Sequence, residues 1–332
     1  MYPFTYVRAA DLRGAIGQAA QDPGVEFVAG GTDMLQLLKD DVRRPTRLVD
    51  LTALSGLSDV SSAASGGLRI GALARMADVA EHPEIRGSYP VISQALLASA
   101  SPQVRNMATM GGNLLQRTRC LYFRDAATPC NKRVPGSGCP AREGQNRHNA
   151  IFGTSEHCIA AHASDLAVAL VALDARVALT GGPRGDREIP VAELHRLPGD
   201  TPHLETVLEQ GELIAALILP DAPYARRSHY LKVRDRASFE WALTSAAVGL
   251  DIDEAGGTIR QARIAVGGVG TKPWRLPQVE AALAGSKPDD AAFRAAAERA
   301  GEGAQTYGHN AFKVELVKRT VARALAKVGG AA

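Results

Sequence analysis

The spacing of apolar and polar positions predicts a chain in which short helices alternate with short strands. Leu12, Ala15, Ile16 and Ala19 recur at three- and four-residue steps, which is typical of the buried face of a helix. Similar patterns predict helices at 34–39, 76–81 and 90–100, and strands at 25–29, 47–51, 67–71 and 213–219. We therefore expect two mixed α/β units, which span residues 1–55 and 56–220.

The last third of the chain has a different pattern and is expected to form a third domain, residues 221–332. Strands are predicted at 228–233, 246–252 and 259–266. The chain then ends in a helical stripe, in which Leu316, Val317, Val321 and Leu325 share one apolar face. The fold class expected from this order is α+β, and a length of 332 residues agrees with more than one domain.

Composition and charge exclude several classes of protein. Hydrophobic residues make up 45% of the chain and charged residues 22%, which is ordinary for a globular protein, and no apolar run is long enough to span a membrane. The segment Met1–Tyr6 lacks the basic and apolar regions of a signal peptide, so we expect synthesis in the cytoplasm. A periplasmic location would require export together with a partner. No nucleic-acid-binding module is recognisable.

Two glycine-rich turns are candidate anion-binding loops. Gly30-Gly31-Thr32-Asp33 lies between a predicted strand and a predicted helix, and Thr109-Met110-Gly111-Gly112-Asn113 is predicted to be a tight turn. Backbone N–H groups at such a helix start bind phosphate, and glycine permits its close approach. An ordinary strand-to-helix turn can carry the same residues, so neither loop alone identifies a ligand.

All four cysteines lie in one irregular segment, at Cys120, Cys130, Cys139 and Cys158. Four thiolates can hold an iron–sulfur cluster, whereas structural zinc favours cysteine pairs two to four residues apart, and no such pair exists here. Two disulfides or four unlinked thiols are the other possibilities. Residues 116–149 carry seven cations against two anions, and this positive charge favours an anionic cluster.

Taken together, these motifs resemble one family. The two glycine loops, with Gln103-Val104-Arg105-Asn106 before the second, are similar to the pyrophosphate loops of the FAD-binding subunits of molybdenum hydroxylases. This family includes the xanthine dehydrogenase and carbon monoxide dehydrogenase flavoproteins. Ala163-Ser164-Asp165-Leu166 resembles its Asp segment, and Tyr230-Leu231-Lys232-Val233-Arg234 its Lys-containing strand. The resemblance implies an FAD-binding fold of the vanillyl-alcohol-oxidase type, in two α/β subdomains, followed by a C-terminal flavoprotein domain.

The insertion at about 116–160 departs from the common family pattern. It resembles the insertion in the FAD subunit of bacterial periplasmic aldehyde oxidoreductases, which carries a [4Fe-4S] cluster. The similarity extends to the residues around all four cysteines, such as Pro129-Cys130-Asn131-Lys132. The resemblance therefore implies metal ligation by Cys120, Cys130, Cys139 and Cys158. The flavin subunit of 4-hydroxybenzoyl-CoA reductase, which has a comparable insertion, and xanthine dehydrogenase-like subunits are the alternatives within the family.

The resemblance also implies roles for individual residues. The glycine loops would hold the FAD pyrophosphate, Asp165 would bind ribityl or ribose hydroxyls, Lys232 would reach the polar edge of the flavin, and Ile214 would pack on its face. The implied cofactor residues are Glu26, Phe27, Val28, Ala29, Gly30, Gly31, Thr32, Asp33, Met34, Thr109, Gly111, Gly112, Asn113, Asp165, Ile214 and Lys232. Two simpler roles stay open: Asp165 as a helix cap, and Lys232 as an exposed strand residue.

The function implied is electron transfer in a larger oxidoreductase. No residue of this chain is expected to act as a substrate acid or base. Electrons from an aldehyde, oxidised on a large molybdenum-cofactor subunit, would pass through a small [2Fe-2S] subunit to FAD and then to an external acceptor. A cysteine-stapled binding module without redox activity is the alternative from another class. The substrate, the acceptor and the place of the [4Fe-4S] cluster in the electron path are not fixed by the sequence.

Overall fold

The first sheet lies at the N-terminal end of the molecule and is parallel. The computed structural model describes residues 1–253 and 255–330. The first sheet has three strands, β1 (Thr5–Arg8), β3 (Arg47–Asp50) and β2 (Val25–Val28), in that order across the sheet. The connecting helices are α1 (Leu12–Gln21) and α2 (Met34–Lys39). Strand β1 was not predicted, because three of its four residues are exposed and carry no strong apolar pattern.

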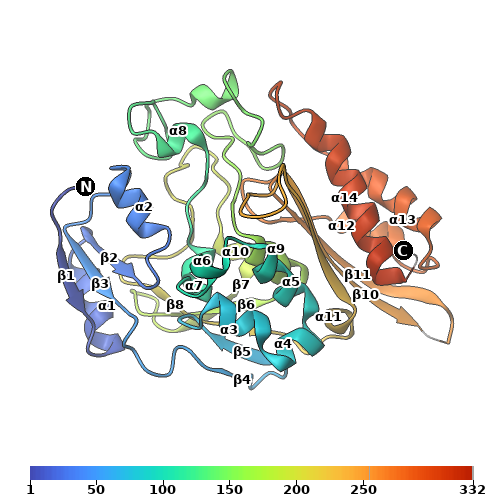
Figure 1. The fold of residues 1–332 in the computed structure, drawn as a ribbon, viewed down its shortest axis with the longest axis horizontal. Coiled ribbons are helices and arrows are strands. Elements are labelled where there is room, and N and C mark those ends of the chain that lie inside the picture. The colour runs from blue at the N-terminus through green and yellow to red at the C-terminus, as the bar shows by residue number, and fades with distance from the viewer. Residues whose placement is uncertain (254, 331–332) are drawn as a thin grey trace.

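The second sheet is antiparallel and has five strands, in the order β4-β5-β8-β6-β7. Every residue of its central strand β8 is buried, and this explains the continuous apolar run in the sequence. The strands are β4 (Val60–Ser62), β5 (Leu68–Gly71), β6 (Arg176–Thr180), β7 (Arg187–Pro190) and β8 (Leu213–Leu219). The helices of this unit include α3 (Met76–Glu81), α4 (Pro83–Ser88), α5 (Pro90–Ala98) and α9 (Asp165–Ala172). Figure 1 shows these helices between the second and third sheets.

The third sheet is also antiparallel, and its order is β12-β11-β10-β9. Its strands are β9 (Ser228–Val233), β10 (Thr244–Asp253), β11 (Thr258–Gly267) and β12 (Trp274–Arg275). The helices α12 (Pro277–Leu283), α13 (Asp290–Ala297) and α14 (Phe312–Gly329) share its hydrophobic core. Helix α9 contacts β10 and β11 from the side of the second sheet, and all eight of its residues are buried. This position explains why α9 is apolar on every side.

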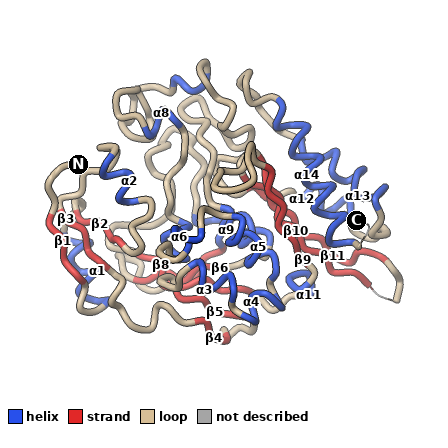
Figure 2. Tube along the Cα trace, viewed as in Figure 1, coloured by secondary structure: helices blue, strands red, loops and turns tan. Residues whose placement is uncertain are grey.

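The segment that carries the cysteines is largely irregular. It contains only the short helix α8 (Leu121–Arg124) and one 3-10 turn, Pro140–Arg142, and the rest is loop (Figure 2). The remaining short elements are α6 (Pro102–Arg105), α7 (Met110–Leu114), α10 (Val191–Leu194), α11 (Pro223–Arg226) and a second 3-10 turn, Glu298–Gly301. None of the helices in residues 1–253 and 255–330 is long and apolar enough to cross a membrane.

Candidate functional site

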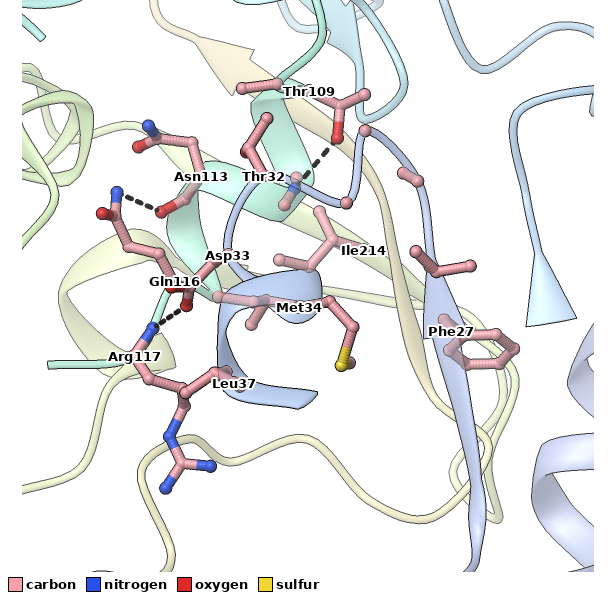
Figure 3. A pocket seen from close by; sticks show the side chains of 18 of the residues that line it. Phe27, Thr32, Asp33, Met34, Leu37, Thr109, Asn113, Gln116, Arg117 and Ile214 are labelled. Carbon is pink, nitrogen blue, oxygen red and sulfur yellow. Dashed lines mark hydrogen bonds between the residues drawn. The ribbon is translucent and has the colours of Figure 1, made fainter. Parts of the chain in front are cut away.

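One large cavity is lined by nearly all of the cofactor residues that were predicted from the sequence. Its volume is about 720 Å³, within the usual range for a cofactor site, and its wall combines both glycine loops with α7, β8 and the loop after β9. Figure 3 shows residues of both glycine loops together with Ile214 of β8. All of the cofactor residues named from the sequence line this cavity except Lys232. Segments far apart in the chain thus meet around one space.

The two glycines of the first loop are required for different structural reasons. A Cβ on Gly30 would lie 1.9 Å from the carbonyl oxygen of Met107, so Gly30 is where the chain packs against the approach to the second loop. Gly31 has φ of +70°, a left-handed conformation that disfavours other residues. The loop therefore needs Gly30 for packing and Gly31 for its turn.

The second glycine loop is the start of a helix and not the isolated tight turn that the sequence predicted. Thr109 caps α7, because its Oγ1 accepts a hydrogen bond from the N–H of Gly112 at 3.3 Å. A Cβ on Gly111 would lie 2.9 Å from the Cβ of Ala72, so glycine allows α7 to pack closely beside the second sheet. Both loops thus lie at a helix N-terminus that borders the cavity, where the helix dipole favours an anion.

Asp33 joins the first glycine loop to the cysteine segment. Its carboxylate accepts hydrogen bonds from the backbone N–H of Arg117 at 2.8 Å and from the guanidinium of Arg124 at 2.9 Å (Figure 3). Arg119 forms a further ion pair with it at 2.9 Å. The sequence placed Asp33 in the cofactor loop but gave no sign of these partners, because they lie more than 80 residues further along the chain.

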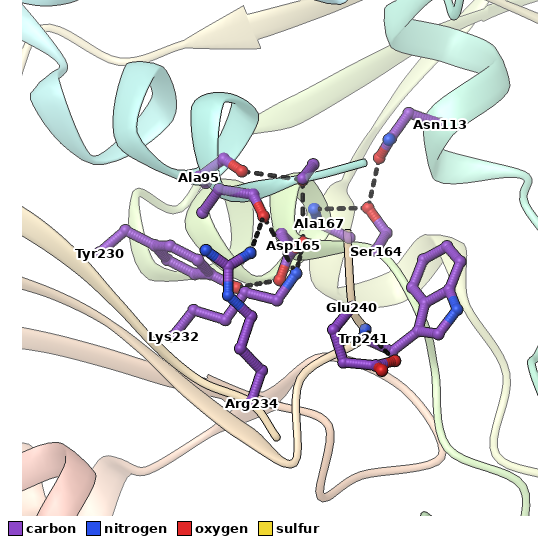
Figure 4. Close-up of polar contacts among 12 residues, drawn as sticks. Ala95, Asn113, Ser164, Asp165, Ala167, Tyr230, Lys232, Arg234, Glu240 and Trp241 are labelled. Atoms are coloured by element: carbon purple, nitrogen blue, oxygen red, sulfur yellow. Dashed lines mark hydrogen bonds and ion pairs between the residues drawn. The ribbon is translucent and has the colours of Figure 1, made fainter. Parts of the chain in front are cut away.

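Asp165 is the centre of a buried polar cluster in the wall of the same cavity (Figure 4). It accepts hydrogen bonds from the Tyr230 hydroxyl at 2.5 Å and from the Ser99 hydroxyl at 2.8 Å, and Lys232 Nζ lies 2.8 Å from it. Burial, reinforced by the charge of Asp165, raises the pKa of Tyr230 well above its usual value. This phenol therefore stays a hydrogen-bond donor.

Both of the simpler roles left open for this pair are wrong. The helix α9 is capped by Ser164, whose Oγ accepts from the N–H of Ala167 at 3.0 Å, and Asp165 is the first residue inside the helix. The side chain of Lys232 is only 3% exposed and is bound to Asp165, so it is no surface residue. Lys232 does not line the cavity itself but contacts Asp165, which does.

A loop after β9 forms part of the cavity mouth and was missed by sequence reasoning. Arg236, Phe239, Glu240 and Trp241 line the cavity, and Phe239 is 56% exposed despite its large apolar ring. The guanidinium of Arg119 lies 4.3 Å from the centre of the Trp241 ring, which is the geometry of a cation–π contact. The exposed aromatic residues were the available signal, since such side chains on a polar loop often mark a binding surface.

The four cysteines come together, as their confinement to one segment predicted. All four line one small cavity of about 10 Å³, and none forms a disulfide. Asn149 donates its side-chain amide to Cys120 Sγ at 3.6 Å, and the N–H of Ala160 donates to Cys158 Sγ at 3.5 Å. Such N–H donors are typical surroundings of cluster thiolates.

The thiols are not arranged around a metal-sized space. No group of three or more His, Cys, Asp or Glu side chains is placed to hold a metal ion as it stands, within the part of the chain that the structure describes. Burial raises the pKa of Cys120 and Cys139, and raises that of Cys158 to about 11, so these groups are protonated thiols. Ligation would require their deprotonation.

A buried ion network lies between the cavity and the cysteines. Glu205 pairs with Lys132 at 2.8 Å and with Arg117, and both cations belong to the cysteine segment. Burial opposes the ionisation of Glu205, but the charges of Lys132 and Arg117 outweigh it and lower its pKa. The segment is thus anchored by charge at Glu205 on one side and at Asp33 on the other.

The fold and this cavity identify the class of protein. Residues 2–222 match the family of FAD-binding domains in molybdopterin dehydrogenases, and residues 229–328 match the C-terminal domain of the CO dehydrogenase flavoproteins. The chain therefore belongs to the FAD-binding subunits of the molybdenum hydroxylases and is an oxidoreductase subunit. The expected fold class is confirmed, and the alternative of a module without redox activity is wrong.

Individual relatives agree with this family. The chain is 47% identical over 328 residues to the aldehyde oxidoreductase FAD-binding subunit PaoB of Escherichia coli, with 98% of each chain covered. It is 27% identical to the glyceraldehyde dehydrogenase medium chain of Sulfolobus acidocaldarius, over 87% of this chain and 85% of that one. The fold matches a Cu,Mo-CO dehydrogenase chain with a TM-score of 0.77 at 21% identity, with 100% of each chain covered.

Proposed function

We propose that this chain is the FAD-binding electron-transfer subunit of a molybdenum-containing aldehyde oxidoreductase. The observation that carries the proposal is the 47% identity, along nearly the whole chain, to an aldehyde oxidoreductase FAD-binding subunit. The other candidates, xanthine dehydrogenase-like and 4-hydroxybenzoyl-CoA reductase-like enzymes, differ in the substrate that the complete complex oxidises or reduces. When bound, FAD would supply a two-electron carrier that can deliver electrons to an external acceptor.

The FAD pyrophosphate would be held between the two glycine loops. Its negative charge suits the positive N-termini of α2 and α7, which both border the cavity. At α7 the phosphate would meet this dipole, since the N–H groups of Met110, Gly111 and Gly112 already donate to Ala74, Ala72 and Thr109. Gly31 and Gly112 would allow the phosphates to approach the backbone. Glu26–Met34 would thus form one side of the site and Thr109–Asn113 the other.

The flavin end would lie toward Asp165 and Ile214. Asp165 is an anion at the cavity wall whose ion pair with Lys232 fixes its position, so it would accept hydrogen bonds from ribityl or ribose hydroxyls. Ile214 faces the cavity from β8 and would pack on the ring face. Lys232 lies behind Asp165, outside the cavity wall, and would act on the flavin only through its ion pair with that carboxylate.

A [4Fe-4S] cluster on Cys120, Cys130, Cys139 and Cys158 is the second part of the proposal. The four thiols line one cavity, backbone and side-chain N–H groups point at two of the sulfurs, and the surrounding segment is strongly basic. This donor set fits a cluster better than zinc, because the cysteines are not paired at zinc spacing. The three-domain division at residues 55/56 and 220/221 also remains a proposal.

Iron and acid-labile sulfide in the anaerobically purified protein test the cluster directly. We expect about four of each per chain, with a broad visible absorbance beside the flavin bands. Replacing Cys139 with Ser should abolish the iron while FAD remains, because the FAD cavity does not contain Cys139. One equivalent of zinc, or two disulfides found by mass spectrometry, would contradict the assignment.

The remaining redox centres would belong to partner chains. The chain has four cysteines, and one cluster would use all of them, so a [2Fe-2S] centre needs another polypeptide. A small [2Fe-2S] subunit and a large molybdenum-cofactor subunit would complete a heterotrimer. Co-expression of the three chains followed by size-exclusion chromatography tests this assembly, and a chain that stays monomeric beside both partners would contradict it.

A further inference from the structure

Lys313 is a lysine buried without a carboxylate partner. Its exposed fraction is 0%, and Nζ donates hydrogen bonds to the carbonyl oxygens of Asn149 at 3.0 Å and Gly268 at 2.7 Å. Among the ion pairs of the described residues, none includes Lys313. Buried lysines are almost always paired, so this one needs an explanation.

The position of Lys313 in its helix makes its charge more costly still. Lys313 is the second residue of the 18-residue helix α14, whose N-terminus carries a positive partial charge. Cations are disfavoured there, and Arg147 adds a second positive charge nearby. Burial, with the smaller effect of Arg147, lowers the pKa of Lys313 to about 7. Within residues 1–253 and 255–330, no carboxylate is paired with this amine, whose hydrogen bonds go to two backbone carbonyl oxygens.

Lys313 is connected to the cysteines by hydrogen bonds through Asn149. Asn149, whose carbonyl accepts from Lys313, donates its side-chain amide to Cys120 Sγ. The segment just before α14 is hydrogen-bonded to residues 146–150 as well. The N–H of His309 donates to the side chain of Asn146 at 3.0 Å, and the side chain of Asn310 donates to the carbonyl oxygen of Ala150 at 3.1 Å. A single residue, Asn149, thus contacts both Lys313 and Cys120.

We propose that Lys313 is the counter-charge of the [4Fe-4S] cluster and sets its reduction potential through Asn149. This inference rests on the cluster assignment made above. A cluster with four thiolate ligands is a net anion and gains one more negative charge when it is reduced. A buried cation close to it stabilises the reduced form more than the oxidised form, because the local dielectric constant is low. Lys313 is a positioning and tuning residue and not a ligand.

Neutral and charged replacements at position 313 test this role. We expect Lys313→Gln to lower the midpoint potential of the cluster, measured by anaerobic redox titration followed by electron paramagnetic resonance. Lys313→Arg keeps the positive charge, so its midpoint potential should stay close to that of the unmodified protein. Lys318→Met is the matched control, because Lys318 lies on the same helix but is partly exposed and paired with Glu298. Its potential should equal that of the unmodified protein.

The FAD content of each sample shows whether the variant has folded, independently of the cluster. Loss of iron in Lys313→Gln but not in Lys313→Arg, with FAD retained in both, would also support a charge requirement. Equal potentials in Lys313→Gln and the unmodified protein would overturn the inference. Loss of iron in both variants would overturn it too and assign Lys313 a packing role. Absence of iron from the unmodified protein would instead refute the cluster assignment itself.

Discussion

Lys232 and Asp165 form a buried ion pair that joins the third sheet to the start of α9. Lys232 Nζ lies 2.8 Å from the carboxylate, and the two side chains are 3% and 4% exposed. The pair comes from β9 and from the first turn of α9, two elements separated by more than 60 residues. It therefore holds the third sheet against the wall of the large cavity.

Removal of only one member of this pair should be strongly destabilising. Lys232→Met leaves a buried carboxylate without its cation, which costs about 3–5 kcal/mol of the free energy of unfolding. The double variant with Asp165→Asn should lose much less than the sum of the two single losses, because no unpaired charge remains. Urea unfolding of the four proteins measures this coupling, and strictly additive losses would show that the pair does not act as a unit.

Gly31→Val should expel FAD from the protein. The φ of +70° and the 3.3 Å approach of a Cβ to Leu35 leave no relaxed position for a valine side chain, which would also occupy the phosphate space. The flavin-to-protein absorbance ratio measures the effect. Gly185→Val is the matched control, because Gly185 has φ of +64° in open space on the β6–β7 turn. Full FAD retention by Gly31→Val would refute the pyrophosphate assignment.

Asp33→Asn should loosen the joint between the first glycine loop and the cysteine segment. The amide keeps the shape but loses the charge that faces Arg119 and Arg124, so these guanidinium groups lose their ion-pair partner. We expect a loss of about 1–3 kcal/mol in stability. Limited proteolysis should then cut residues 116–160 faster than in Glu315→Gln, whose exposed pair with Arg319 lies on α14. Equal cutting rates would contradict the proposed joint.

The stability of the iron-free protein should rise between pH 7 and pH 9 because of Lys313. The folded protein binds this proton only below about pH 7, whereas the unfolded chain holds it up to about pH 10.5, so a higher pH favours the folded state. The gain from Lys313 is about 2 kcal/mol over the two units. The raised pKa values of Cys120, Cys139 and Cys158 act in the opposite direction once the unfolded thiols ionise at about pH 8.5, so the Lys313 contribution is the difference between the unmodified protein and Lys313→Met. The lowered pKa of His148 lies below this window.

Denaturant unfolding at pH 7 and pH 9 tests this pH dependence. Lys313→Met should remove the rise, since methionine does not titrate, and Lys318→Met should preserve it. An equal rise in the Lys313→Met protein would assign the pH dependence to another group.

Much of the fold was predictable because its signals are local. The helices 34–39 and 76–81 and the strands 213–219 and 228–233 have the predicted bounds, since apolar periodicity and flanking turns mark them clearly. The order of the glycine loops, Asp165 and Lys232 was enough to indicate the family. The exposed strand β1 and the short helix α7 escaped prediction, because β1 has little apolar pattern and the glycines of α7 suggested a turn.

The contacts that organise the site were not predictable in the same way. Asp33 meets Arg119 and Arg124, and Lys313 meets Asn149, across 80 to more than 160 residues of sequence. Such pairs depend on the packing of segments far apart in the sequence and leave no local pattern. Lys313 falls within a helix that the sequence described only by its apolar stripe, and its burial could be found only in three dimensions.

Reduction of the bound FAD by an aldehyde is the most direct test of the proposed function. The absorbance of the flavin is followed anaerobically after addition of an aromatic or aliphatic aldehyde, first with the isolated chain and then with the complex that contains both partner subunits. We expect no bleaching in the isolated chain and rapid bleaching in the complex. Bleaching of the isolated chain, or a fully loaded complex whose flavin no aldehyde reduces, would contradict the assignment of this chain as the electron-transfer subunit of an aldehyde oxidoreductase.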